Sequence, residues 1–261
     1  MSEQQRKYHI GFGIADLGTE AVRDVLLCGD PERARRIAFE TAGVNCLKTL
    51  SEHRGLHSYL CQRQGHGLFV AATSGMGAPS LSIVVNELFD LGLNRIIRVG
   101  TCGSIREGVE VGSVVISQAA LCRQGAALDI APVEYPAAAD PFLTVSLVEA
   151  ARTLDVDWHL GVTASVDTFY EGQERTASSA NPYLLRSLSG VTEEYRQLGV
   201  FNYEMEAGTL FKMGLVYGFA AGCVCGVLAD RSSSEEVVAA RKRQAEEAAV
   251  QVALAALGEA H

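Results

Sequence analysis

An arginine stands inside an apolar strand in the segment Arg95–Ser104, RIIRVGTCGS. Burying the guanidinium of Arg98 without a partner is costly, so we expect it to meet a carboxylate or a bound anion. The residues after this strand predict a turn that offers backbone N–H groups and a hydroxyl to phosphate: Gly100, Thr101, Gly103 and Ser104. The segment predicts an oxyanion pocket at the carboxyl end of a central strand, or else a structural arginine paired with Asp or Glu.

A second arginine follows the short strand predicted at 25–28. Gly29-Asp30-Pro31 ends this strand, and the proline predicts the first turn of a helix with Arg33 near its amino end. The helix dipole does not favour a cation there, so a nearby anion would explain it. Taken alone, the segment fits a solvated arginine better.

Two carboxylates, Glu204 and Glu206, lie two residues apart in the segment FNYEMEAG. In an extended segment such residues share one side. With Met205 between them, they could accept hydrogen bonds from two sugar hydroxyls while the methionine contacts the ring. The alternative is a pair of acidic residues favoured by the start of a helix.

The segment DTFYEGQER places an aromatic ring, an amide and a guanidinium on one loop after a strand, at Phe169, Gln173 and Arg175. The ring could stack on a base, and the two polar groups could bind a ring edge that carries two carbonyls and an N–H. The alternative is a surface loop held by a contact between Glu174 and an arginine.

These segments require a scaffold of alternating strands and helices. We expect strands at 25–28, 56–62, 67–73, 95–99, 111–117, 160–166 and 220–228. We expect helices from Pro31, and at 80–91, 143–154, 182–188, 193–198, 207–217 and 235–257. This alternation predicts a parallel or mixed sheet covered on both faces, and 261 residues suit one domain over 1–261.

Composition narrows the partners. The net charge is −9 and no run of Lys and Arg stands out, which disfavours nucleic acid and anionic membranes as partners. The seven cysteines are odd in number and no apolar signal core opens the chain, so we expect a cytoplasmic protein. Cys223 and Cys225 fit core thiols better than a metal or redox site. The Gly-rich bend SGMGAPS matches a dinucleotide-binding fingerprint only weakly, and no triphosphate-binding loop occurs.

Seven motifs in order, covering nearly the whole chain, resemble the uridine phosphorylases of the nucleoside phosphorylase I family: YHIG, LCGDPER, SGMGAPS, RVGTCGS, GVTASVDTFYEGQER, FNYEMEAGTL and GVLADR. The resemblance implies a single α/β domain around a distorted mixed β-sheet flanked by helices. It also implies a homo-oligomer, a hexamer built as a trimer of dimers, with active sites at the subunit interface.

The same resemblance implies a role for individual residues. Those expected to bind phosphate are Gly29, Arg33, Arg98 and Thr101, with Arg54 from the neighbouring subunit. Those expected to bind ribose are Glu204, Met205 and Glu206, with His9 reaching across the dimer. Those expected to bind or line the uracil are Phe169, Gln173, Arg175, Leu228 and Ala229, with Arg231 as electrostatic support. We assign catalysis to Arg98, Gln173, Arg175 and Glu206.

The implied reaction is phosphorolysis of uridine to uracil and ribose 1-phosphate, with inorganic phosphate as co-substrate and no metal or cofactor. Asp230 stands where uridine phosphorylases commonly carry Asn, which keeps a purine or broad-specificity phosphorylase as the second hypothesis. Gly55 stands where relatives carry a glutamate that helps to bind a monovalent cation, so we expect that site to be lost or altered. Two further hypotheses are a nucleosidase that uses water and a nucleoside-binding protein without turnover.

Overall fold

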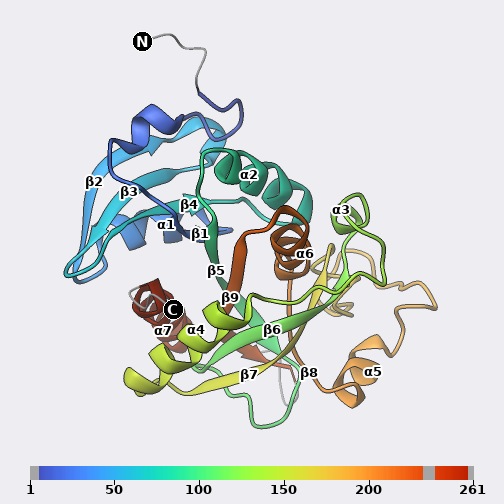
Figure 1. Ribbon diagram of the computed structural model, residues 1–261. Helices are drawn as coiled ribbons and strands as arrows, with labels where there is room; N and C mark the ends of the chain where they lie inside the picture. The colour runs from blue at the N-terminus through green and yellow to red at the C-terminus, as the bar shows by residue number, and fades with distance from the viewer. Residues whose placement is uncertain (1–5, 232–238, 258–261) are drawn as a thin grey trace.

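The computed structural model describes residues 6–231 and 239–257, which fold as a single α/β domain (Figure 1). Its sheet contains nine strands within this part of the chain, in the order β2-β3-β4-β1-β5-β8-β7-β6-β9. The strands are β1 Asp24–Cys28, β2 Val44–Ser51, β3 Ser58–Arg63, β4 Leu68–Thr73, β5 Arg95–Ser104, β6 Val114–Arg123, β7 Trp158–Val166, β8 Val200–Glu204 and β9 Ala220–Asp230. The predicted distorted mixed sheet flanked by helices is confirmed.

The distortion centres on β5. Along its length β5 pairs in parallel with β9, and its last two residues, Gly103 and Ser104, also pair antiparallel with β8. Since β9 pairs in turn with β6, strands β5, β8, β7, β6 and β9 close into a ring of hydrogen-bonded neighbours. The carboxyl ends of β5, β8 and β9 therefore converge, and this convergence positions the residues discussed below.

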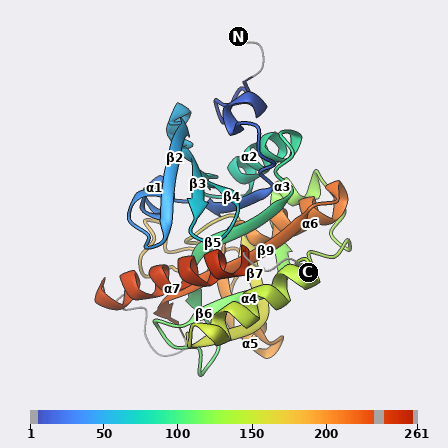
Figure 2. The ribbon, with the colours of Figure 1, turned by 60° about the vertical axis from the view of Figure 1, so that its left-hand side comes forward.

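Helices cover both faces of the sheet (Figures 1 and 2). The longer helices are α1 Pro31–Phe39, α2 Ala78–Asp90, α4 Pro141–Thr153, α6 Ala207–Tyr217 and α7 Ala239–Leu257, with shorter helices α3 Gly125–Leu128 and α5 Val191–Gln197. Figure 2 shows α4 and α7 on the same side of the sheet. Because side chains alternate along a strand, Leu26 of β1 packs in the core cluster beneath α1, α4 and α7, while Leu27 packs in the cluster beneath α2 and α6.

Several local predictions are wrong. The turn expected at Gly100 to Ser104 is strand, because β5 continues there alongside β9. Strands β2 and β8 were not predicted, and no helix forms at 182–188. The expected start of the last helix at Glu235 lies outside the described residues.

Within 6–231 and 239–257, no helix combines the length and apolar character that a membrane span requires. The same residues contain no group of three or more His, Cys, Asp or Glu side chains placed to hold a metal ion.

Candidate active site

A cavity of about 310 Å³ opens where β5, β8 and β9 converge. Most of the residues selected from the sequence line it: Gly29, Arg33, Arg98, Thr101, Phe169, Gln173, Arg175, Glu204, Met205, Glu206, Leu228 and Ala229. These residues come from separate parts of the chain, so the fold, and not their spacing, brings them together.

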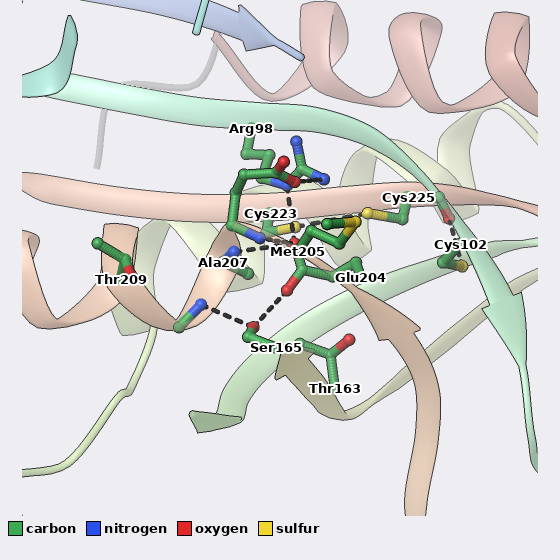
Figure 3. A network of polar contacts seen from close by, with 12 residues as sticks. Arg98, Cys102, Thr163, Ser165, Glu204, Met205, Ala207, Thr209, Cys223 and Cys225 are labelled. Carbon is green, nitrogen blue, oxygen red and sulfur yellow. Dashed lines mark hydrogen bonds and ion pairs between the residues drawn. The ribbon is translucent and has the colours of Figure 1, made fainter. Parts of the chain in front are cut away.

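Arg98 projects from β5 and is 5% exposed. Its Nε donates to Glu204 Oε2 at 2.9 Å, and one terminal nitrogen is ion-paired with Glu206 (Figure 3). Burial acts to lower the pKa of Arg98, but Glu206 and Glu204 hold that pKa well above its ordinary value. The expected pairing with carboxylates is therefore confirmed, and Arg98 also lines the cavity.

Gly100 makes room for this guanidinium. A Cβ atom at residue 100 would lie 2.9 Å from a terminal nitrogen of Arg98 and 2.8 Å from Cys225 Sγ. Residues two apart on a strand share a face, so any side chain at residue 100 would compete with Arg98 for space. Gly100, one of the small residues that suggested a turn, therefore leaves space for the Arg98 side chain on the same face of the strand.

Glu204 ends β8 and Glu206 precedes α6, and both carboxylates reach Arg98 as expected of residues sharing one side. Glu204 Oε2 also accepts the backbone N–H groups of Glu206 and Ala207, each at 2.8 Å, and Oε1 accepts the Ser165 hydroxyl (Figure 3). Glu206 Oε1 accepts the backbone N–H of Gly77 at 2.5 Å. Burial raises the pKa of Glu206, and Arg98 offsets part of that rise.

Arg33 lies in the first turn of α1 and is 7% exposed, so the prediction of a solvated arginine is wrong. One terminal nitrogen donates to the Val99 carbonyl at 3.3 Å, and the other donates to Glu246 Oε1 of α7 at 3.2 Å. The anion that its position called for is therefore, in this structure, a carboxylate from the far end of the chain.

The loop after β7 presents its aromatic and polar groups together. The Arg175 guanidinium carbon lies 4.4 Å from the Phe169 ring centroid, and Arg175 Nε donates to Gln173 Oε1 at 3.2 Å. Glu174 accepts the backbone N–H groups of Gly190 and Thr192 at the start of α5, at 2.5 and 2.7 Å. Backbone N–H groups thus anchor the loop, and the charge of nearby Arg231 also contributes to lowering the pKa of Glu174.

Four selected residues do not line the cavity of their own subunit. His9 Nδ1 lies 2.6 Å from Glu87 Oε1, and Arg54 stands 5.8 Å from the Tyr8 ring centroid. Asp230 ends β9, and the Arg231 guanidinium donates a hydrogen bond to the Gln173 carbonyl at 2.7 Å. Arg231 thereby supports the loop that carries Gln173.

The sequence did not identify every residue at the site. Met76 and Tyr203 also line the cavity, and Ser165 holds Glu204; all three lie inside segments that were singled out for different residues. Glu246, in contrast, lies in a helix rich in Ala and Glu, where nothing local distinguishes it.

The chain is similar to known enzymes over almost its whole length. A family model described as the phosphorylase superfamily matches residues 23–258. Uridine phosphorylase from Salmonella typhimurium is 39% identical over 249 residues, covering 95% of this chain and 96% of that protein. Uridine phosphorylase from Thermococcus kodakarensis is 38% identical over 94% of this chain and 84% of that protein. A DeoD-type purine nucleoside phosphorylase from Hahella chejuensis is 33% identical over 89% of this chain and 92% of that protein.

Proposed function

The chain belongs to the phosphorylase superfamily, and we propose that it catalyses the phosphorolysis of uridine to uracil and ribose 1-phosphate. The observation that carries this proposal is one cavity that contains two buried arginines, two buried carboxylates and the Phe169 loop. Phosphate, ribose and base each find groups of suitable chemistry there. The uridine phosphorylases of Salmonella and Thermococcus support uridine as the substrate.

In this mechanism a phosphate oxygen attacks C1′ from the face opposite the leaving base. Arg98 and Arg33 hold the phosphate next to the sugar, where its negative charge stabilises the positive charge that develops on the ribose. Glu204 and Glu206 accept the ribose hydroxyls. Preorganised donors of this kind can each contribute about 3 kcal/mol in a transition state, because they require no rearrangement as charge forms.

The leaving uracil gains negative charge as the glycosidic bond breaks. Gln173 is 3% exposed and Arg175 lies beside it, so both present donors to the base from a region with little water. Phe169 stacks on the ring while Leu228 and Ala229 bound the pocket. A site that binds both edges of a ring rejects bases that lack the matching groups.

The test is to measure uracil release from uridine with and without phosphate, together with the ribose 1-phosphate formed. We expect release to require phosphate and the two products to appear in equal amounts. Release that is independent of phosphate would identify a nucleosidase, and binding without release would identify a silent binding protein.

A purine or broad-specificity phosphorylase is the second candidate, because Asp230 could protonate a purine. The purine-type relative from Hahella is matched at lower identity than the two uridine phosphorylases above, which favours uridine. A panel of uridine, thymidine, inosine and adenosine in phosphate buffer separates the candidates. We expect Asp230→Asn to leave uridine cleavage within about twofold of wild type; a collapse would make Asp230 a proton donor.

We further propose that the enzyme is a hexamer, a trimer of dimers, in which His9 and Arg54 complete the site of the neighbouring subunit. Their place outside the cavity of their own subunit supports this arrangement. Mixing Arg98→Met with Arg54→Ala subunits tests it, since a mixed dimer contains one intact site. Recovery of activity on mixing supports shared sites, whereas two inactive variants that stay inactive after subunit exchange refute them.

Two smaller expectations accompany the proposal. We place the enzyme in the cytoplasm, and the free thiol state of all seven cysteines supports a reducing compartment. We also expect no dependence on a monovalent cation. Gly55 has φ of 74°, a left-handed conformation in which the glutamate side chain of the relatives would be strained. Equal activity in potassium and in choline salts is the expected result.

A further inference from the structure

Arg33 lies between two hollows. It lines the catalytic cavity, and it also lines a second hollow of about 210 Å³ between α1 and α7. A flexible arginine at such a boundary can turn toward either side, and only one side holds substrate. Some contact must therefore hold the Arg33 guanidinium toward the catalytic cavity.

Two contacts fix that orientation. One terminal nitrogen of Arg33 donates a hydrogen bond to the Val99 carbonyl at 3.3 Å, and the other donates to Glu246 Oε1 at 3.2 Å. The Nε–H of Arg33 is buried and has no hydrogen-bond partner within the described residues. Within those residues, the contacts of the two terminal nitrogens are therefore what holds the guanidinium in place.

Glu246 is itself held in place. It is 5% exposed, and its second oxygen accepts a terminal nitrogen of Arg36 at 2.6 Å. Arg33 and Arg36 stand three residues apart on α1, so they lie on the same face of the helix and one carboxylate bridges them. Burial acts to raise the pKa of Glu246, but Arg33 and Arg36 hold that pKa below its ordinary value.

The packing of α7 on the sheet determines where Glu246 lies. A Cβ atom at Gly226 of β9 would lie 2.4 Å from the Ala245 carbonyl oxygen, so the glycine lets the backbone of α7 contact the strand. Glu246 is the next residue along α7. The same β9 strand continues to Leu228 and Ala229 in the catalytic cavity, so one strand positions both the base pocket and this helix.

We propose that Glu246 is a positioning residue for phosphate: it bridges Arg33 and Arg36 and keeps the Arg33 guanidinium at the catalytic cavity. Glu246 does not line that cavity, so it acts through Arg33 and does not contact the substrate. This inference rests on the proposed phosphorolysis. Without the bridge, the Arg33 side chain keeps only the Val99 hydrogen bond among the described residues, and it can turn into the second hollow.

The test is Glu246→Gln, which keeps the size of the side chain and removes its charge. We expect the KM for phosphate to rise about tenfold, a factor typical of a displaced positioning group, while the KM for uridine stays within about twofold. The rise in Tm that phosphate produces in the wild-type enzyme should shrink in parallel, because it reports binding to the folded protein. A general loss of structure would instead alter both KM values and kcat.

The matched control is Glu247→Gln. Glu247 follows Glu246 on α7, but it pairs with Arg243 at 2.8 Å and both side chains are exposed. We expect no change in the KM for phosphate in this variant. A second variant, Arg36→Gln, removes only one side of the bridge, so we expect an increase of roughly threefold. If Glu246→Gln fails to fold, the KM for phosphate of Arg36→Gln tests the proposal in its place.

The outcomes separate the two proposals. If wild-type uracil release and Tm are both independent of phosphate, phosphorolysis is wrong and this inference fails with it. If the wild type requires phosphate but Glu246→Gln and Arg36→Gln keep its KM unchanged, the inference alone is wrong. A lower KM for phosphate in Glu246→Gln would also overturn it, since the carboxylate would then be competing with phosphate for Arg33.

Discussion

The two buried arginines of the cavity are held in opposite ways. Arg98 pairs with Glu204 and Glu206, which line the same cavity and are the proposed ligands of the ribose. Arg33 pairs with Glu246, which lines the second hollow, between α1 and α7. Ribose binding therefore changes the surroundings of Arg98 directly, whereas those of Arg33 depend on how α7 packs. In the proposed phosphate site, one arginine thus pairs with carboxylates that would contact the substrate, and the other pairs with a carboxylate that would not.

Replacing Arg98 should have the largest effect. Arg98→Met keeps much of the volume but leaves Glu204 and Glu206 buried together without a cation. We expect kcat/KM for phosphorolysis to fall by about 10²- to 10³-fold, because phosphate loses a preorganised donor, and stability to fall by about 3 kcal/mol or more. Steady-state kinetics and thermal unfolding measure the two effects. Activity within tenfold of wild type would show that the Arg98 pairing is structural only.

Gly100→Ala tests the same side of the comparison more gently. The added methyl would meet the Arg98 guanidinium at 2.9 Å and Cys225 Sγ at 2.8 Å, so one of them must move. We expect a loss of about 1–3 kcal/mol in stability from overpacking and a fall of roughly tenfold in kcat/KM. Gly108→Ala is the control for an added methyl, since a Cβ there would meet no atom within 4 Å, although its φ of 80° adds local strain. Equal losses of activity in the two variants would contradict a specific effect on Arg98.

Gly226→Ala tests the other side of the comparison. The methyl would force α7 away from β9 at Ala245 and so displace Glu246. We expect the KM for phosphate to rise about fivefold with a smaller change in the KM for uridine, together with a loss of about 1–3 kcal/mol in stability. If the KM for uridine rises as much as the KM for phosphate, the packing of α7 does not act specifically on the phosphate side of the site.

The smallest effect concerns pH. The folded protein holds the pKa of Glu246 below its ordinary value of 4.5, so ionised Glu246 stabilises the fold above that value. This contribution is lost as the pH falls through the lowered pKa, since the unfolded chain takes up the proton first. We expect the wild type to have a higher Tm than Glu246→Gln at pH 7, and the difference to vanish under acidic conditions. A difference that grows toward low pH would reverse the sign and refute the interpretation.

Much of the fold follows from the sequence because most strands and helices carry their own hydrophobic pattern. The missed strand β2 is an edge strand in which half of the residues are polar and only Leu50 is buried, so it lacks that pattern. The helix expected at 182–188 fails because its residues are largely exposed and bury no apolar face. The small residues of β5 imitate a turn, but Gly100 pairs with Cys225 in the ladder with β9. In each case long-range pairing or burial, which no local pattern records, decides the outcome.

The residues of the candidate site differ in the same way: some could be selected from a local segment, and others are defined only by long-range contacts. Glu204 and Glu206 could be selected because they lie close together in one short segment that reaches Arg98. Glu246 could not, because the residue that it contacts, Arg33, is 213 positions away and its own helix has no distinguishing feature. Local chemistry thus suggested these groups and the family resemblance selected them, whereas the groups that hold them in place require the three-dimensional structure.

The closure of β5 onto both β8 and β9 has a consequence for how the protein is made. A ribosome synthesises β5 long before β9, so β5 cannot pair with β9 until β9 has left the exit tunnel. Until β8 and β9 have been synthesised, β5 lacks these two neighbouring strands, and Arg98 lacks its partners Glu204 and Glu206. Synthesis of nearly the whole chain therefore precedes the assembly of a competent site, and such late, non-local pairing is the kind of step that slows folding.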